Sequence, residues 1–157
     1  MTDIRQKAID GLEAGDRFSI TREFTEADVY GFAAITGDYN PVHFDKRFSD
    51  ARGFDGPVCH GLLVAAMISE IGGQIGWLAS GMQFDFKKPV YFGDRIVCDF
   101  KITYVDDRGR AEAVAEYRNQ HGALVMKGFL KGVLPGRAER SVMAQMVAEG
   151  DPTNRLE

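Results

Sequence analysis

Hydrophobic and polar residues alternate along five stretches of the chain, and this alternation predicts β-strands. A period of two places every second side chain on the same face of a sheet. The turn sequences Asp106-Asp107-Arg108-Gly109 and Gln120-His121-Gly122 each separate two such stretches, so we expect hairpins there. The five predicted strands are residues 16–22, 82–86, 96–104, 110–119 and 123–134.

A helix is predicted to begin after Thr25 and to end at Gly37. Thr25 and Asp28 have the spacing of a capping box, in which each side chain accepts a hydrogen bond from the other residue's backbone. A glycine is the usual residue just past a helix end. The side predicted to face the core carries Val29, Phe32, Ala33 and Ile35.

Residues 61–72 predict a second, buried helix, because this segment is apolar on nearly all sides. Gly72-Gly73 is expected to end or bend it. A short helix capped by Asp45 is expected before it, and an amphipathic helix over 137–149 after the strands.

One strand, then helices, then four antiparallel strands is an α+β order. The buried helix needs cover, so we expect a five-stranded antiparallel sheet wrapped around it. We predict three regions: an N-terminal extension (1–14), one domain (15–135), and a short helix with a disordered polar tail (136–157).

Composition excludes several classes of function. The net charge of -4 and the lack of a basic stripe argue against a nucleic-acid partner. No apolar run is long enough to cross a membrane, and Met1–Lys7 lacks an apolar signal core. We therefore expect a cytoplasmic protein without a membrane partner, in which Cys59 and Cys98 are free thiols.

Candidate chemistry lies in Gly37-Asp38-Tyr39-Asn40-Pro41-Val42-His43. Asn40-Pro41 is a turn signal, and a bend there lets Asp38 and His43 converge on one pocket. A carboxylate and an imidazole together can move protons at neutral pH. The alternative interpretation is a loop in which Asp38 caps a turn and His43 is a core residue.

This motif resembles the MaoC-like family of (R)-specific enoyl-CoA hydratases and dehydratases. The resemblance continues in order through Gly53-Phe54-x-x-Pro57, His60-Gly61 and Phe92-Gly93-Asp94, the last after Lys88-Pro89-Val90. It covers roughly residues 15 to 135. The resemblance implies the hot-dog fold, which agrees with the predicted order of elements.

The resemblance also implies a reaction, the reversible hydration of trans-2-enoyl-CoA to (R)-3-hydroxyacyl-CoA. Asp38 is then the expected base and His43 the expected acid, although which residue moves which proton stays open because a coupled pair titrates as a unit. The Gly61 amide, at a helix start, is the expected donor to the thioester carbonyl. Coenzyme A enters as part of the substrate, no other cofactor is expected, and the family implies a homodimer.

Other residues near these motifs have supporting or alternative interpretations. Asn40 is expected to shape the turn, and Ser69 matches a family serine that bonds the catalytic carboxylate, although a helical serine can also bond its own backbone. His60 is expected to bond a loop carbonyl. A metal site formed by Asp38, His43, Asp45 and His60 fits no familiar ligand spacing, and none is expected. Cys59 is expected to pack rather than react.

Two rival functions remain for this fold: an acyl-CoA thioesterase and a non-catalytic acyl-thioester binding module. Both are compatible with it, because fold does not fix function. The presence of both an acid and a base disfavours the binding module.

Overall fold

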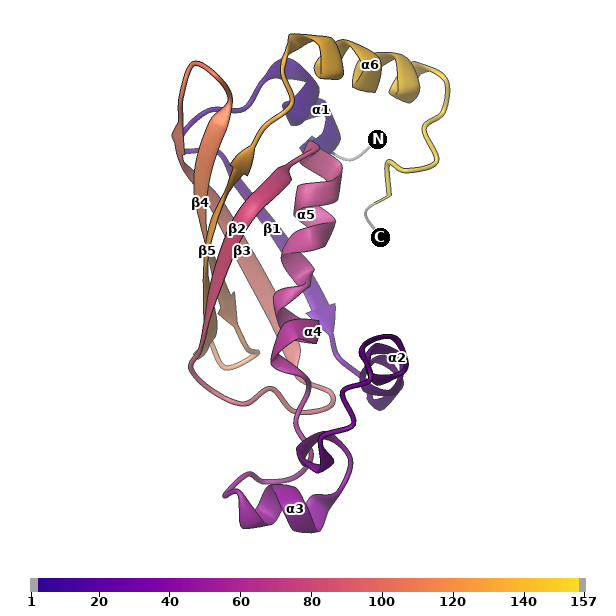
Figure 1. Ribbon diagram of the computed structural model, residues 1–157, viewed down its shortest axis with the longest axis vertical. Coiled ribbons are helices and arrows are strands. Elements are labelled where there is room, and N and C mark those ends of the chain that lie inside the picture. The colour runs from indigo at the N-terminus through magenta and orange to yellow at the C-terminus, as the bar shows by residue number, and fades with distance from the viewer. Residues whose placement is uncertain (1–2, 156–157) are drawn as a thin grey trace.

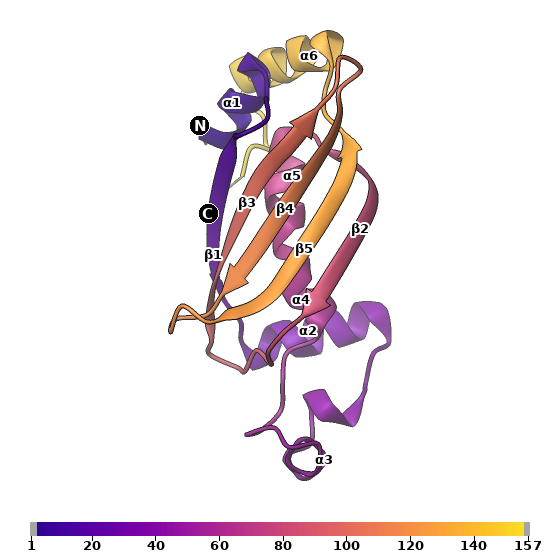
Figure 2. The same ribbon diagram turned by 90° about the vertical axis from the view of Figure 1, so that its left-hand side faces the viewer.

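The computed structural model describes residues 3–155 as an antiparallel five-stranded sheet with helices on one face. The strand order is β1-β3-β4-β5-β2, so the first two strands of the sequence form the two edges (Figure 2). This confirms the predicted fold class. The strands are β1 (Arg17–Glu23), β2 (Leu78–Phe86), β3 (Arg95–Val105), β4 (Arg110–Arg118) and β5 (Leu124–Val133).

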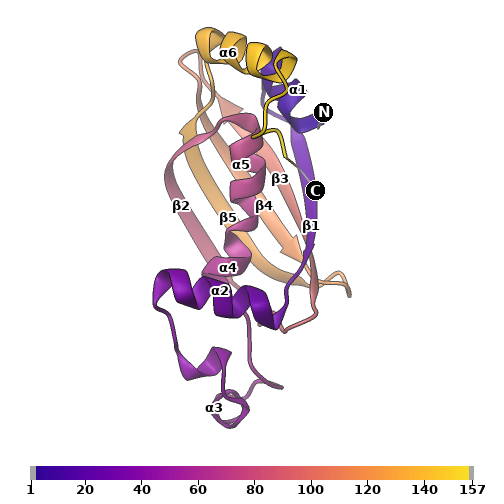
Figure 3. The same cartoon turned by 90° about the vertical axis from the view of Figure 1, so that its right-hand side faces the viewer.

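The helices α4 and α5 lie along one face of the sheet as a single broken rod, and the remaining helices gather at its two ends (Figures 1 and 3). The core lies between this rod and the inner face of the sheet, and it includes Ile71 of α5 together with Ile96 and Ile102 of β3. The helices are α1 (Asp3–Asp10), α2 (Glu26–Thr36), the 3-10 turn η1 (Pro41–His43), α3 (Lys46–Ala51), α4 (Gly61–Ala65), α5 (Met67–Ile75) and α6 (Arg137–Ala148).

The central helix breaks at Ala66 and not at the predicted glycines. Ser69 N–H bonds the Ala66 carbonyl at 2.8 Å, which tightens the turn, and the buried Tyr117 hydroxyl donates to the Ala65 carbonyl at 2.9 Å. The Gly72-Gly73 pair lies inside α5, which ends only at Gly76, in the left-handed region. Packing along the sheet thus outweighs the weak helix propensity of glycine.

The capping box at the start of α2 is present as predicted, and Gly37 ends the helix with a φ of 75°. Val29 and Ala33 are buried, but the prediction was wrong for Ile35, which is 87% exposed. Ile35 follows Ala33 by two residues and therefore points about 200° away around the helix axis.

Helix α1 and residues 151–155 meet beside α5. The Arg5 guanidinium pairs with the buried Asp151 carboxylate at 3.0 Å, and Gln74 donates to the carbonyls of Thr153 and Arg155. The prediction of a disordered tail was therefore wrong for residues 150–155, because these polar contacts hold the segment on the helix. Met1, Thr2, Leu156 and Glu157 lie outside the described residues.

The edge strand β2 exposes apolar side chains, with Leu78 at 74% and Phe86 at 57%. At the end of β3 a register shift between Ile102 and Tyr104 interrupts the regular pairing with β4, and Tyr104 is 52% exposed. Within residues 3–155, none of the helices is long and apolar enough to span a bilayer.

Candidate active site

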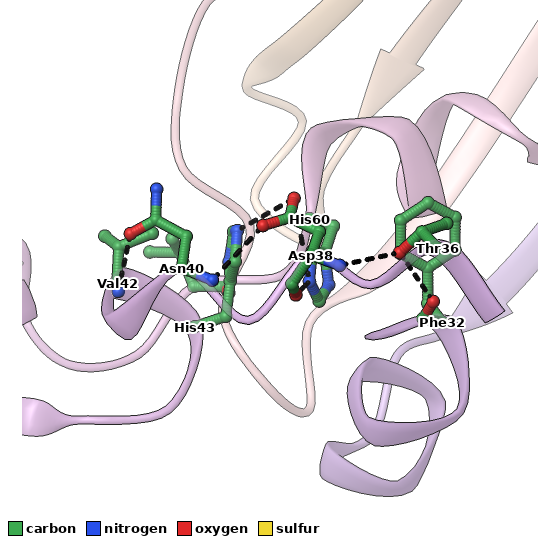
Figure 4. Close-up of polar contacts among 8 residues, drawn as sticks. Phe32, Thr36, Asp38, Asn40, Val42, His43 and His60 are labelled. Carbon is green, nitrogen blue, oxygen red and sulfur yellow. Dashed lines mark hydrogen bonds and ion pairs between the residues drawn. The ribbon is translucent and has the colours of Figure 1, made fainter. Parts of the chain in front are cut away.

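A series of hydrogen bonds between residues close in sequence shapes the loop after α2 around Asp38 (Figure 4). The Thr36 hydroxyl donates to the Phe32 carbonyl at 2.8 Å and accepts from Asp38 N–H at 3.3 Å. The Asp38 Oδ1 accepts from Asn40 N–H at 3.2 Å. These bonds occupy one carboxylate oxygen and leave Oδ2 to face the imidazoles.

Asn40 shapes the turn as predicted, since its side-chain oxygen accepts from Val42 N–H and caps η1. The turn brings His43 under the loop, where it is buried. His43 Nδ1 lies 2.7 Å from the Val58 carbonyl oxygen. A carbonyl only accepts, so Nδ1 carries the hydrogen and Nε2 of the neutral ring is an acceptor.

The predicted convergence of Asp38 and His43 is present. His43 Nε2 lies 3.9 Å from Asp38 Oδ2, and His60 Nε2 lies 4.0 Å from the same oxygen. The Asp38 side chain is 48% exposed, whereas the two imidazoles lie beneath it with side-chain exposures of 10% and 2%. The arrangement places an accessible carboxylate over two buried rings (Figure 4).

The pKa of His43 is lowered from its ordinary 6.5, first because burial penalises the charged ring. The Val58 carbonyl opposes this effect, His60 lowers the pKa further, and the Asp38 carboxylate raises it. The net direction favours the neutral ring at neutral pH, with Nε2 ready to accept a proton.

His60 also contacts the loop directly. Its Nε2 lies 2.9 Å from the Asp38 backbone carbonyl, so the prediction that it bonds a loop carbonyl is confirmed. Its ring stacks on His43 with centroids 3.8 Å apart. His60 is also the residue that precedes the first turn of α4.

A cavity of about 340 Å³ opens beside this cluster, lined by Asp38, His43, His60 and Gly61 together with Phe86 and Lys88. No side chain of the described residues caps the first turn of α4. Backbone N–H groups of this turn therefore have no side-chain partner among the described residues, and Gly61, the predicted donor, lines the cavity.

Gly61 also lies close to the Phe86 ring. A Cβ built on it would lie 2.6 Å from a ring carbon of Phe86. A larger side chain would have to displace this ring, which lines the same cavity.

Ser69 is not brought to Asp38 within one chain. It follows Gly61 by eight residues, a rise of about 12 Å along a helix, and it is exposed. It lines a second cavity of about 180 Å³ between α5 and β2, with Trp77 and Met82.

Two alternative chemistries can be compared with the geometry. Burial raises the pKa of the Cys59 thiol to about 12, which disfavours a nucleophile and agrees with packing. Asp38, His43 and His60 offer atoms within 4.8 Å of one another, a spacing that a cation can use. His60 Nε2, however, would first have to give up the hydrogen that it shares with the Asp38 carbonyl.

Sequence reasoning missed Thr36 and Val58, which hold Asp38 and His43 in place. A threonine in the last turn of a helix often bonds backward to a carbonyl, so Thr36 had a local signal. Val58 acts through its backbone carbonyl, for which the side chain gives no signal.

Comparison with known proteins identifies the class. The family model of the MaoC like domain matches residues 12–123. The chain is 33% identical over 129 residues to an (R)-specific enoyl-CoA hydratase of Aeromonas caviae, which covers 79% of this chain and 96% of that protein. It is 26% identical over 154 residues to a 3-hydroxybutyryl-CoA dehydratase of Methylorubrum extorquens, covering 96% and 98%.

Comparison with solved structures leads to the same class of protein. The (R)-hydratase from A. caviae involved in PHA biosynthesis superposes with a TM-score of 0.74 at 32% identity, covering 80% of this chain and 98% of that one. The fold and these relatives together define a hot-dog hydro-lyase. The chain belongs to the MaoC-like family, and it is an enzyme of the hydratase and dehydratase class.

Proposed function

We propose that this enzyme reversibly hydrates trans-2-enoyl-CoA to (R)-3-hydroxyacyl-CoA, with Asp38 and His43 as the reacting pair. The observation that carries the proposal is the 3.9 Å approach of Asp38 Oδ2 to His43 Nε2 at the wall of the cavity. The named substrates and products of the relatives support the choice of an acyl-CoA.

The attacking water lies between the two side chains. A water about 2.8 Å from each of two atoms 3.9 Å apart makes two hydrogen bonds at roughly a right angle. Its oxygen bonds to the β-carbon while one of its protons passes to the pair. A proton from the pair is then delivered to the α-carbon on the same side of the double bond, and both residues return to their starting states.

The lowered pKa of His43 sets the order of events at this residue. His43 begins neutral, and its Nδ1–H donates a hydrogen bond to the Val58 carbonyl oxygen. It therefore serves as an acid at the α-carbon only after Nε2 has accepted a proton. Asp38 orients the water and shares that proton with His43 as a coupled pair.

The thioester carbonyl is assigned to the start of α4. Enolate charge develops on this oxygen during the reaction. A fixed backbone N–H donor typically stabilises such a charge by about 3 kcal/mol. Gly61 lines the same cavity as the pair, so its N–H is within reach of a substrate held there. The absence of a Cβ leaves room for the Phe86 ring, which lines the same cavity.

A homodimer completes the proposal. The β2 edge has no neighbouring strand in the described chain and exposes Leu78, Met82 and Phe86, so a second copy can cover it. A two-fold axis there would bring α4 of one subunit toward α5 of the other. Ser69, remote from its own Asp38, would then serve the carboxylate of the partner.

Incubation with trans-2-butenoyl-CoA tests the reaction. Hydration removes the enoyl absorbance without releasing free thiol, and chiral separation of the product should give the (R)-3-hydroxy isomer. Release of free thiol would instead identify a thioesterase, and binding without either signal would identify a binding module.

A further inference from the structure

We infer that His60 is a positioning residue, which holds the Asp38 loop in register with the start of α4. The inference rests on the proposed function and adds a role for a side chain that does not itself exchange protons with the substrate. Three contacts of one residue support it: a hydrogen bond to Asp38, a ring stack on His43, and its own place at the first turn of α4.

The hydrogen bond fixes the backbone of the carboxylate residue. His60 Nε2 donates to the Asp38 carbonyl oxygen at 2.9 Å, across 22 residues of sequence. The other bonds to Asp38 come from its near neighbours, Thr36 and Asn40. His60 therefore ties the backbone of Asp38 to a different element of the fold.

The stack fixes the second member of the pair. The rings of His60 and His43 are 3.8 Å apart with 30° between their planes, and Phe32 of α2 packs against His60 with ring centroids 4.9 Å apart. His43 is thus held by Val58 at Nδ1 and by His60 on one ring face. These contacts leave Nε2 as the ring atom aimed at Asp38.

The backbone of His60 joins the pair to the proposed carbonyl donor. The His60 carbonyl accepts from Val64 N–H at 3.2 Å, which is the first turn of α4, and Gly61 follows it directly. One residue thus connects the proton-transfer loop with the helix start. A shift of about 1 Å in the position of catalytic groups relative to one another can lower the rate of an enzyme about a hundredfold.

Simple packing does not explain a histidine at this position. His60 is 1% exposed, and its Nδ1 is buried without a partner among the described residues. A buried polar atom without a hydrogen bond costs stability, so an apolar ring would fill the space at lower cost. The hydrogen bond from Nε2 to the Asp38 carbonyl explains why a histidine occupies this position although its Nδ1 has no partner among the described residues.

Two substitutions of His60 distinguish the effect of its hydrogen bond to Asp38 from the effect of its ring stack on His43. His60→Phe keeps an aromatic ring against His43 but removes the donor. His60→Gln removes the ring but carries an amide N–H about as far from the backbone as Nε2. His121→Phe, in an exposed turn, is the matched control.

We expect His60→Phe to lower kcat by about a hundredfold, with KM for trans-2-butenoyl-CoA changed less than about threefold. His60→Gln should recover at least tenfold of that loss, and His121→Phe should match the wild type. Wild-type kcat in His60→Phe, an effect confined to KM, or no recovery in His60→Gln would overturn the inference.

Two measurements do not depend on the reaction. Nitrogen-15 NMR of the unmodified enzyme should place the His60 hydrogen on Nε2, and a crystal structure of His60→Phe should show a longer distance from Asp38 Oδ2 to His43 Nε2. A hydrogen on Nδ1, or an unchanged distance, would overturn the inference. An enzyme that passes both tests but does not hydrate enoyl thioesters would instead refute the proposed function.

Discussion

The Tyr117 hydroxyl donates a hydrogen bond of 2.9 Å to the Ala65 carbonyl, at the point where the central helix breaks. Tyr117 reaches this carbonyl from β4, and both residues are buried. The contact satisfies a backbone acceptor that the break removes from the helical ladder. It also fixes the direction of α4, whose first residue is the proposed carbonyl donor.

Removal of this hydroxyl should destabilise the protein. Tyr117→Phe leaves the Ala65 carbonyl buried without its partner, which typically costs about 1–3 kcal/mol of unfolding free energy. Urea unfolding measures the change, and Tyr104→Phe is the control because Tyr104 is 52% exposed. Equal stability of the two variants would contradict a stabilising role for this hydrogen bond.

A complex should place the substrate carbonyl at α4. With a saturated, unreactive acyl-CoA bound in the cavity, we expect the thioester oxygen within about 3.2 Å of the Gly61 nitrogen. A crystal structure measures this directly. A thioester oxygen that points away from α4 would refute the assignment of Gly61.

Crowding at Gly61 should reduce activity. Gly61→Ala keeps the N–H but directs a methyl group at the Phe86 ring, and we expect kcat/KM to fall roughly tenfold to a hundredfold as the ring shifts into the cavity. Steady-state kinetics measures the loss. Adding Phe86→Ala should restore part of it, whereas no restoration would mean that crowding is not the cause.

The sequence predictions succeeded for features that depend on neighbouring residues and failed for features that depend on tertiary contacts. The capping box at Thr25 and the glycine end at Gly37 depend on residues a few positions apart, so the sequence was sufficient. The break at Ala66 coincides with the hydrogen bond from Tyr117 to the Ala65 carbonyl, two residues that lie 52 positions apart. No local pattern contains that information.

Most residues of the candidate site could be predicted from the sequence, but few of the contacts between them could. His60 bonds the Asp38 carbonyl as expected, but the His60 stack on His43 and the role of the Val58 carbonyl needed the folded chain. Ser69 was predicted near Asp38 by resemblance alone and is exposed on α5 instead. The polar tail was misjudged because its contacts to Arg5 and Gln74 are distant in sequence.

Association should depend on the β2 edge. Leu78→Lys places a charge on the proposed two-fold interface, and we expect both dimer formation and specific activity to fall at least tenfold at micromolar concentration, the loss expected from about 1.4 kcal/mol of weaker association. Sedimentation and activity are measured on the same samples. Thr21→Lys, on the opposite edge strand β1, is the control.

A fully active monomer of the unmodified enzyme at assay concentration would contradict both the dimer and the shared site. An equal effect of Thr21→Lys would instead place the interface elsewhere on the molecule.

Activity should fall on the acid side of neutrality. Burial holds the pKa of His43 below 6.5, so the ring is neutral at pH 7 and becomes charged only at lower pH. Protonation removes the Nε2 acceptor, and kcat/KM should therefore decrease as pH falls, with a midpoint below 6.5. A midpoint above that value would contradict the neutral resting state.

An NMR titration isolates the effect on the ring. The Asp38 carboxylate raises the pKa of His43, so Asp38→Asn should move the His43 midpoint to still lower pH. An upward movement would show that the two groups do not interact as the geometry indicates.

The most direct test of the reacting pair is the hydration rate of Asp38→Asn, His43→Ala and the double variant with trans-2-butenoyl-CoA. Each single change should lower kcat by about a hundredfold to ten-thousandfold, and the double variant should be little worse than either, because a coupled unit fails when one member is lost. Asp50→Asn, which removes an exposed carboxylate paired with Lys46, should leave the rate unchanged. Folded single variants that keep wild-type hydration would contradict the account.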